Sequence, residues 1–383
     1  MSQGRFSELD AVRGIAAFVV VLHHCWEAVL PDQNTYPLLG RALAGTGWSA
    51  DAAFWISVTP LRLLFCGHAA VGVFFVLSGF VLTKSLQNPR QPGYAAFVVR
   101  RFFRIYPPFA FVILSAALIC NAFDSQPIPG RDWINLSWLE PVSPRLVAGH
   151  LLMLVTAGTY NSLDSPMWTL VHELRISMIF PPLAAAAIAW PRWTLAISLA
   201  VFAGFSVQHF TQPLTHLIAA QLPRDIVGSF LQSARYVLFF VFGILIAAYP
   251  AALADWLKRR ERWRPALWAA ALLLLAIPYA KAYLELCYAV GASLVIALCI
   301  HSEPAKRLLR HAALQRLGKV SYSLYLSHQI VLLTLAHLLY RQLPMGAIML
   351  LVVPSSLLVA DLLNRLVELP SSELGKRIAF SFT

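Results

Sequence analysis

Long apolar runs recur along the whole chain and alternate with short polar or charged segments. A helix needs about 20 mostly apolar residues to cross the hydrocarbon core of a bilayer. Runs of that kind lie at residues 11–30, 64–84, 104–121, 166–189, 193–210, 229–249, 266–281, 283–300, 319–341 and 344–367. The pattern predicts an all-α polytopic membrane helix bundle with about ten transmembrane helices. We expect a single integral-membrane domain over residues 1–383, with no soluble appended domain.

One further apolar segment, 146–157, is short enough to be a half-helix or a surface helix. Positive residues are enriched in cytoplasmic loops, and here they concentrate in 84–104, 256–264, 301–319 and the C-terminal tail. Ten helices and a cytoplasmic N-terminus put all four regions on the cytoplasmic side. An eleventh helix at 146–157 would force the later regions outside. The charge pattern therefore favours ten helices, with both termini in the cytoplasm.

Two longer connections, 122–165 and 211–228, then lie mainly outside. Polar residues in or beside them are candidates to contact a polar acceptor, although surface loops without a function often look the same. These residues are His150, Asp164, Gln208, His209 and His216.

Composition supports the membrane class and excludes others. The chain is 58% hydrophobic and 13% charged, whereas soluble domains average about 25% charged residues. The net charge of +12 follows from 30 Lys and Arg against 18 Asp and Glu, and topology explains it better than nucleic-acid binding does. The five cysteines show no CxxC spacing, so we expect small buried side chains and no metal site. No cleavable signal peptide is expected.

The first apolar run holds charged and titratable residues, which are costly in a membrane and are functional candidates by default. Arg13 and His24 are eleven positions apart, which places them on nearly the same helix face, about 16 Å apart along the axis. Histidine is well suited to take and return a proton near neutral pH. A hydrogen-bonded core histidine is the alternative, complicated by the neighbouring His23. Asp10 is expected to pair with Arg13.

The stretch 67–84 reads GHAAVGVFFVLSGFVLTK. Its glycines allow close approach between helices, and tight packing is at least as good an explanation as ligand contact. Ser78 is a candidate to donate a hydrogen bond to a substrate carbonyl.

Three arginines follow in VRRFFRIYPP, residues 99–108. Arg100, Arg101 and Arg104 could bind phosphate groups bidentately at the cytoplasmic face. The alternative, that they only set topology, carries equal weight from the residues alone.

Glu173 lies inside the apolar run 165–182, and a buried carboxylate needs a partner, for which a histidine is a natural choice. Further along, Tyr322, Tyr325 and His328 are spaced i, i+3, i+6 and form a polar stripe on one helix side. A stripe satisfied by packing alone is the alternative for these three residues.

Taken together, these stretches resemble acyltransferase family 3, multipass bacterial membrane O-acyltransferases that modify surface polysaccharides. The resemblance runs over residues 9–370. It is carried by Arg13…His24, GVFFVLSGF (72–80), the RxxR pair Arg101 and Arg104, the W-[ST]-L-x-x-E motif with Trp168 and Glu173, SYxxYLxH with Ser321, Tyr322, Tyr325 and His328, and Glu368-x-Pro370. One departure is Ser177, where relatives often have tyrosine, and it bears on the acceptor.

The resemblance implies a bacterial inner-membrane enzyme that moves an acyl group, expected to be acetyl, from cytoplasmic acyl-CoA to a hydroxyl of a cell-surface or lipid-linked glycan. The resemblance also implies that no cofactor is bound permanently and that acyl-CoA, expected to be acetyl-CoA, is the donor substrate. His24 is implied as the reacting histidine rather than His23, Arg13 as essential, and the RxxR pair as the donor site. The acceptor glycan and the acyl chain length stay open.

We further expect Glu173 to orient His24, with Glu27 as a rival for that role, and His24 to act as general base or as acyl carrier. The supporting residues would be Ser78, Trp168, Tyr322, Tyr325 and His328. A transporter of lipid-linked sugars or small acids is the alternative, since it could use the same buried charges.

Overall fold

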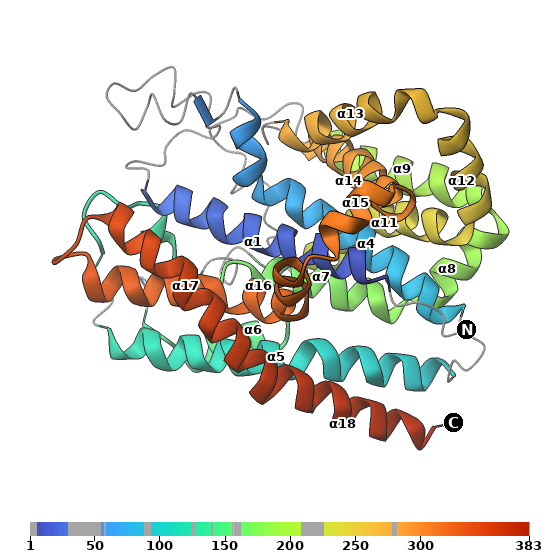
Figure 1. Cartoon of the computed structure of the whole chain (residues 1–383). Helices are drawn as coiled ribbons and strands as arrows, with labels where there is room; N and C mark the ends of the chain where they lie inside the picture. Colours follow the sequence, from blue (N-terminus) through green and yellow to red (C-terminus); the bar gives the residue numbers. More distant parts are fainter. Residues whose placement is uncertain are drawn as a thin grey trace.

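The computed structural model describes residues 6–29, 55–56, 59–87, 93–123, 127–138, 141–154, 156, 162–207, 226–277 and 282–382. Over these residues all regular structure is helical, as the sequence predicts. The α-helices are α1 (Ser7–Val29), α4 (Gly67–Leu86), α5 (Tyr94–Ala122), α6 (Pro144–Leu151), α7 (Met167–Met178), α8 (Phe180–Ala189), α9 (Pro191–Val207), α11 (Ile226–Ala248), α12 (Pro250–Arg259), α13 (Arg264–Ala276), α14 (Glu285–His301), α15 (Glu303–Leu309), α16 (Ala312–Leu339), α17 (Met345–Leu363) and α18 (Leu369–Phe380) (Figure 1).

Each predicted apolar run contains a helix, but fewer than ten helices meet the length and hydropathy expected of a membrane span. Six helices do so outright, and two bent pairs raise the number to eight. The structure therefore supports six to eight candidate spans among the described residues, and the predicted count of about ten is not confirmed. The remaining two runs form α9, with 17 residues, and α13, with 13 residues, and both runs continue into residues outside the described ones.

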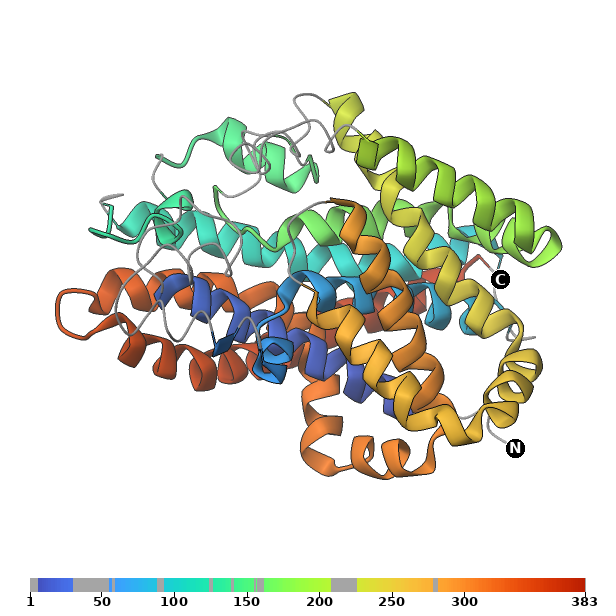
Figure 2. The ribbon, with the colours of Figure 1, turned by 90° about the horizontal axis from the view of Figure 1, so that it is seen from above.

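Proline explains both bends. The α7–α8 pair bends by 66° just before Pro181, and the α14–α15 pair bends by 93° just before Pro304. Proline lacks the N–H that would continue the helical hydrogen bonds, so a helix tends to end ahead of it. In Figure 2 the orange segment formed by α15 and the start of α16 projects to one side of the bundle.

The short segment 146–157 forms only the eight-residue α6, too short to cross a membrane. The last run is longer than expected. The 344–367 run continues through a five-residue π-helical turn, Asn364–Glu368, into α18, giving a 36-residue helical segment. Glu368 in that turn accepts hydrogen bonds from Ser323 at 2.7 Å and Asn364 at 2.8 Å.

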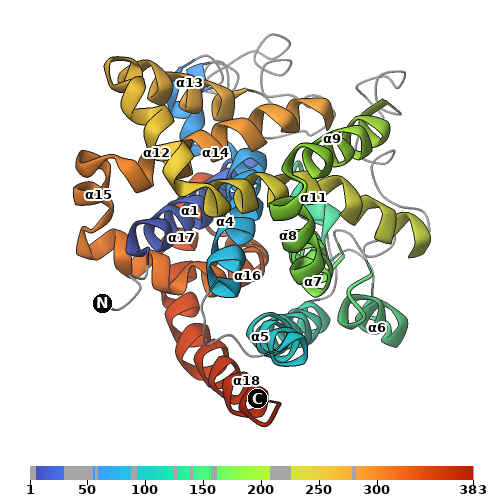
Figure 3. The same cartoon turned by 90° about the vertical axis from the view of Figure 1, so that its right-hand side faces the viewer.

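The helix α1 lies among α4, α14, α16 and α17 near the centre of the end-on view (Figure 3). On another side of the bundle α5 packs against α18 and α7. Helix α1 begins and α18 ends at the same end of the bundle (Figures 1 and 3).

The most extensive helix contact is between α1 and α16. The backbones approach so closely at Gly14 and Gly318 that a Cβ added to Gly14 would lie 2.5 Å from the Gly318 nitrogen, and one on Gly318 would clash with the Asp10 carbonyl oxygen. Ten residues further along each helix, His24 of α1 meets His328 of α16. Because the residue numbers increase on both helices from the first contact to the second, α1 and α16 run parallel.

This close approach generates a prediction for Gly318→Val. We expect the variant to lose about 1–3 kcal/mol of stability, because overpacking forces the two backbones apart. Acyl transfer should fall with it, since the His24–His328 contact depends on the same spacing. Thermal unfolding in detergent checks the stability. Gly204→Val, at a glycine with open space around it, is the control; equal melting temperatures for the two variants would contradict the prediction.

Candidate active site

Polar residues gather at two levels along α1. Near its start lies the arginine cluster, which we define as Arg13, Arg101, Arg104 and Glu173. Further along lies the histidine cluster, defined as His23, His24, His68 and His328. Arg13 and His24 belong to the same helix, eleven residues apart, so the two clusters are separated by about 16 Å along the axis.

Glu173 belongs to the arginine cluster and does not orient His24. Its Oε1 accepts a hydrogen bond from Arg101 at 2.8 Å, as an ion pair, and another from Ser78 at 3.1 Å. Arg101 also donates to Ser177 at 3.2 Å. The expected Glu173–His24 pair is therefore wrong, because α7 places the carboxylate against α5 and α4 instead of against α1. The Ser78 hydroxyl, predicted to face a substrate carbonyl, points to the same carboxylate.

The remaining arginines differ in exposure. Arg13 pairs with Asp10 at 3.6 Å, as predicted, and lies within electrostatic range of Arg104 and Glu173. On α5, Arg100 and Arg104 are exposed, whereas Arg101 is turned inward toward its partner. Of the three predicted phosphate ligands, two thus present a guanidinium to solvent and one is committed to an internal ion pair.

His24 lies between two rings that face it from different segments. Its Nδ1 is 2.9 Å from His328 Nε2, with the ring centroids 5.0 Å apart and nearly parallel. The Trp133 ring lies 5.3 Å away, from the connection before α6. The imidazole therefore faces the bundle interior and not lipid. No feature of the sequence pointed to Trp133.

His23 has a different environment. Its Nδ1 donates to the Phe65 carbonyl oxygen at 3.0 Å, and its ring lies 5.9 Å from that of His68. Glu27 is buried and lies within electrostatic range of His23 and of Arg62. His23 thus matches the hydrogen-bonded core alternative. Over the described residues no group of three or more His, Cys, Asp or Glu has a metal-binding arrangement.

The stripe on α16 contacts three different helices. Tyr322 donates to the Ile105 carbonyl oxygen of α5 at 2.7 Å, and Tyr325 accepts from Thr169 of α7 at 2.7 Å. His328 contacts α1. The packing alternative accounts for both tyrosines, while His328 contacts His24 directly. Trp168 packs its ring against His172 and Tyr236.

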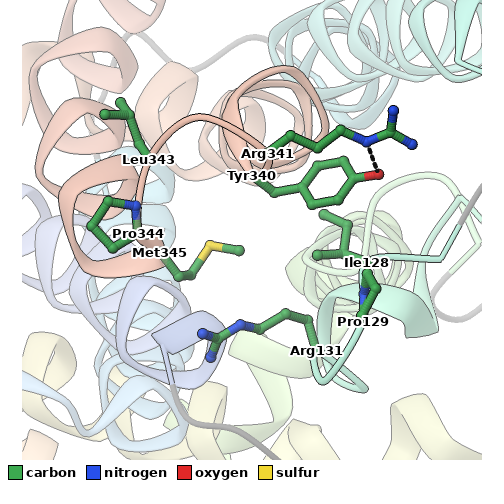
Figure 4. A pocket seen from close by; sticks show the side chains of 8 residues that line it. All are labelled: Ile128, Pro129, Arg131, Tyr340, Arg341, Leu343, Pro344 and Met345. Carbon is green, nitrogen blue, oxygen red and sulfur yellow. Dashed lines mark hydrogen bonds between the residues drawn. The ribbon is translucent and has the colours of Figure 1, made fainter.

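A cleft of about 440 Å³ opens at the far end of α1 from Arg13 (Figure 4). It is lined by Ile128, Pro129, Arg131, Tyr340, Arg341, Leu343, Pro344 and Met345. Arg131 donates to the carbonyl oxygen of Val29, the last residue of α1, at 2.5 Å. A cation at the C-terminal end of a helix is favourable because of the helix dipole. The cleft therefore adjoins the end of α1 that carries His24.

Two of the predicted outer polar residues are fully buried. His150 donates from Nδ1 to the Leu146 carbonyl oxygen at 2.9 Å. Both carboxylate oxygens of Asp164 lack a hydrogen-bond partner among the described residues, and burial raises the pKa of this carboxyl well above its usual range. Gln208, His209 and His216 lie outside the described residues.

Comparison with known proteins gives consistent matches. The family model for the acyltransferase domain matches residues 6–365. "Acyltransferase MdmB" of Streptomyces mycarofaciens is 27% identical over 358 residues, covering 84% of this chain and 85% of the relative. "O-acetyltransferase PaAT-1" of Phomopsis amygdali is 25% identical over 209 residues, 45% of this chain and 39% of the relative. "Protein 2 in picA locus" of Rhizobium radiobacter is 28% identical over 194 residues, 48% of this chain and 84% of the relative. These matches favour acyl transfer over transport.

Asp164 gives a pH prediction. Because the folded chain holds the carboxyl proton more tightly than the unfolded chain does, stability should fall as pH rises from about 4 toward the raised pKa. Asp164→Asn removes this loss, so its melting temperature in detergent should exceed that of the wild type at pH 7. The difference should shrink toward pH 4. A difference independent of pH would contradict the prediction.

Proposed function

Because the chain belongs to acyltransferase family 3 and is an O-acyltransferase, we propose that it transfers an acyl group from cytoplasmic acyl-CoA to a glycan. The acyl group we propose is acetyl, and the acceptor is a hydroxyl of a cell-surface or lipid-linked glycan. The observation that carries this proposal is the placement of His24. Its ring faces the interior on α1, whose other end carries Arg13, and Arg13 lies within electrostatic range of Arg101, Arg104 and Glu173 on α5 and α7. A base on α1 and the arginines of α5 thus lie at two levels of the same bundle, with Arg13 of α1 beside those arginines.

We assign acyl-CoA binding to the region of the arginine cluster, together with the neighbouring Arg100 of α5. The phosphates of CoA are anionic, and guanidinium groups bind phosphate oxygens bidentately. Arg100 and Arg104 are exposed on α5 and are the groups we propose to bind them. Arg101 instead holds Glu173 and so keeps α5 fixed against α7. Arg13 adds positive potential on the path from these phosphates toward His24.

We propose that the glycan acceptor binds on the side of His24 that is nearer the cleft. The cleft is lined by polar and apolar groups in about equal parts, with Arg131, Arg341 and Tyr340 beside apolar side chains (Figure 4). Guanidinium and phenol groups can donate hydrogen bonds to the oxygens of a glycan. Entry from this end lets an acceptor hydroxyl approach the histidine cluster while the donor arrives from the opposite side.

The chemistry follows from His24 as general base. Its unprotonated nitrogen takes the proton of the acceptor hydroxyl while the hydroxyl oxygen attacks the thioester carbonyl carbon. The tetrahedral intermediate then expels the CoA thiolate, which receives the proton from the imidazolium. The products are an ester and CoA thiol. In the acyl-carrier route the same nitrogen attacks the thioester itself, so both routes need a lone pair on His24.

The orientation we propose places both termini in the cytoplasm of a bacterial inner membrane. Helix α1 begins and α18 ends at one end of the bundle, which supports termini on a common side. The basic residues of α15, α5 and the C-terminal segment fit the same side by the positive-inside rule.

The first test of this function is His24→Ala. Purified wild-type protein in detergent, given acetyl-CoA and a glycan acceptor, should release free CoA and acetylate the glycan. Loss of general-base assistance should reduce this by about 10²–10⁴-fold. Thiol titration and mass spectrometry of the glycan measure the two products. Undiminished acetylation by a folded His24→Ala protein would reject the assignment.

A second test separates Arg104 from Arg101. Arg104→Ala should raise KM for acetyl-CoA about tenfold or more with an unchanged melting temperature, because it removes a charge-assisted phosphate contact worth about 1.5–3 kcal/mol. Arg101→Ala should lower the melting temperature, since it leaves Glu173 without its ion-pair partner. An unchanged KM in Arg104→Ala would mean that this arginine only sets topology.

A further inference from the structure

One nitrogen of His328 is committed to its own helix. The side chain is fully buried, and Nδ1 lies 2.8 Å from the Tyr325 carbonyl oxygen and 3.2 Å from that of Leu324. A carbonyl oxygen can only accept a hydrogen bond. The Nδ1 atom of His328 therefore carries a proton and donates it to the backbone.

The other nitrogen of His328 faces His24, 2.9 Å from its Nδ1. Two N–H groups cannot point at each other over that distance, so one of these nitrogens has a lone pair. A neutral imidazole has one donor nitrogen and one acceptor nitrogen. Since His328 already donates through Nδ1, its Nε2 accepts, and His24 donates through Nδ1. The same rule leaves Nε2 of His24 unprotonated. The side chain of Gln329, which also lies within hydrogen-bond reach of His24, can donate as well as accept and is therefore compatible with this tautomer.

We infer that His328 is a positioning residue that holds His24 in the tautomer with a free lone pair on Nε2. Which nitrogen of a histidine carries the proton is set by the hydrogen bond that the other nitrogen makes. The order of contacts is Tyr325 carbonyl, His328, His24. A backbone carbonyl of α16 thus determines which atom of the α1 histidine is able to react. This inference rests on the proposed function, in which that lone pair takes the hydroxyl proton.

The surrounding packing keeps the two rings in this arrangement. Trp133 lies 5.3 Å from the His24 ring and His328 lies 5.0 Å from it, so a ring flip that exchanged Nδ1 and Nε2 would have to disturb both contacts. The close contact of Gly14 with Gly318 fixes the register of α1 against α16 ten residues earlier. The register brings the two histidines to the same level.

A histidine in this place acts differently from the carboxylate of a Ser-His-Asp triad. A carboxylate both fixes the tautomer and stabilises the imidazolium by charge. A neutral imidazole fixes the tautomer but supplies no charge to stabilise the imidazolium. Glu173, the carboxylate expected to supply charge, is held in the arginine cluster. The role of His328 therefore reduces to accepting one hydrogen bond, and any uncharged acceptor of similar reach should replace it.

The kinetic test compares His328→Phe with His328→Gln. Phenylalanine fills the space but accepts no hydrogen bond, so kcat should fall by about 10²-fold or more, as loss of a correctly placed base predicts. Glutamine can accept from His24 Nδ1 and should stay within about tenfold of the wild type. KM for acetyl-CoA should be unchanged in both. His337→Phe, on the same helix and stacked on Trp138, is the matched control and should retain wild-type kcat.

A spectroscopic test reads the tautomer without any turnover. In protein labelled with ¹⁵N-histidine, the signals of His24 are those that disappear in His24→Asn. The wild type and His328→Gln should show His24 protonated at Nδ1 and unprotonated at Nε2. His328→Phe should move the proton to Nε2 or mix the two forms. A purely structural role for His328 would not produce this pattern.

The outcomes separate this inference from the proposed function. A wild type whose His24 is protonated at Nε2, or a His328→Gln protein as inactive as His328→Phe with the tautomer unchanged in both, would overturn the inference. A wild type that releases no CoA from acetyl-CoA would reject the proposed function, while the NMR result would still decide the tautomer.

Discussion

The site depends on the close parallel packing of α1 and α16. Gly14 and Gly318 allow the two backbones to meet, and the same register brings His24 and His328 within 2.9 Å. A side chain at either glycine would push the helices apart, and the histidine contact would then be lost. Small residues at a helix contact therefore set the geometry of a polar pair ten residues away.

Buried charge is distributed among fixed pairs throughout the bundle. Arg101 holds Glu173, and Arg235 of α11 holds Glu285 of α14 at 2.6 Å, both with little exposure. Glu368 accepts from Ser323 and Asn364. An unpaired charge away from water costs several kcal/mol. A buried carboxylate next to an arginine therefore forms an ion pair with that arginine. Among the described residues no carboxylate is hydrogen-bonded to His24, and the inferred partner that fixes its tautomer is the neutral imidazole of His328.

The proposed mechanism uses the length of α1 to keep donor and acceptor apart. Exposed arginines of α5 lie at one level and the cleft beside Val29 lies at the other. A thioester that enters from the arginine cluster and a hydroxyl that enters past the cleft would meet at His24. Such a division would let a cytoplasmic donor modify an acceptor on the far side without either substrate crossing the membrane.

The sequence by itself determined the helical membrane class, the Asp10–Arg13 pair and the helices that carry the candidate residues, because hydropathy and i,i+3 spacing are local properties. It could not decide which residues meet across the bundle. Glu173 was expected at His24 but pairs with Arg101, and Trp133 and the His328 contact had no local signal. Those contacts join residues 72 to 304 positions apart, and only the packing of α5 on α7 and of α1 on α16 selects them. The predicted count of about ten spans is not confirmed among the described residues, where prolines bend two of the predicted runs and two others form helices of 17 and 13 residues.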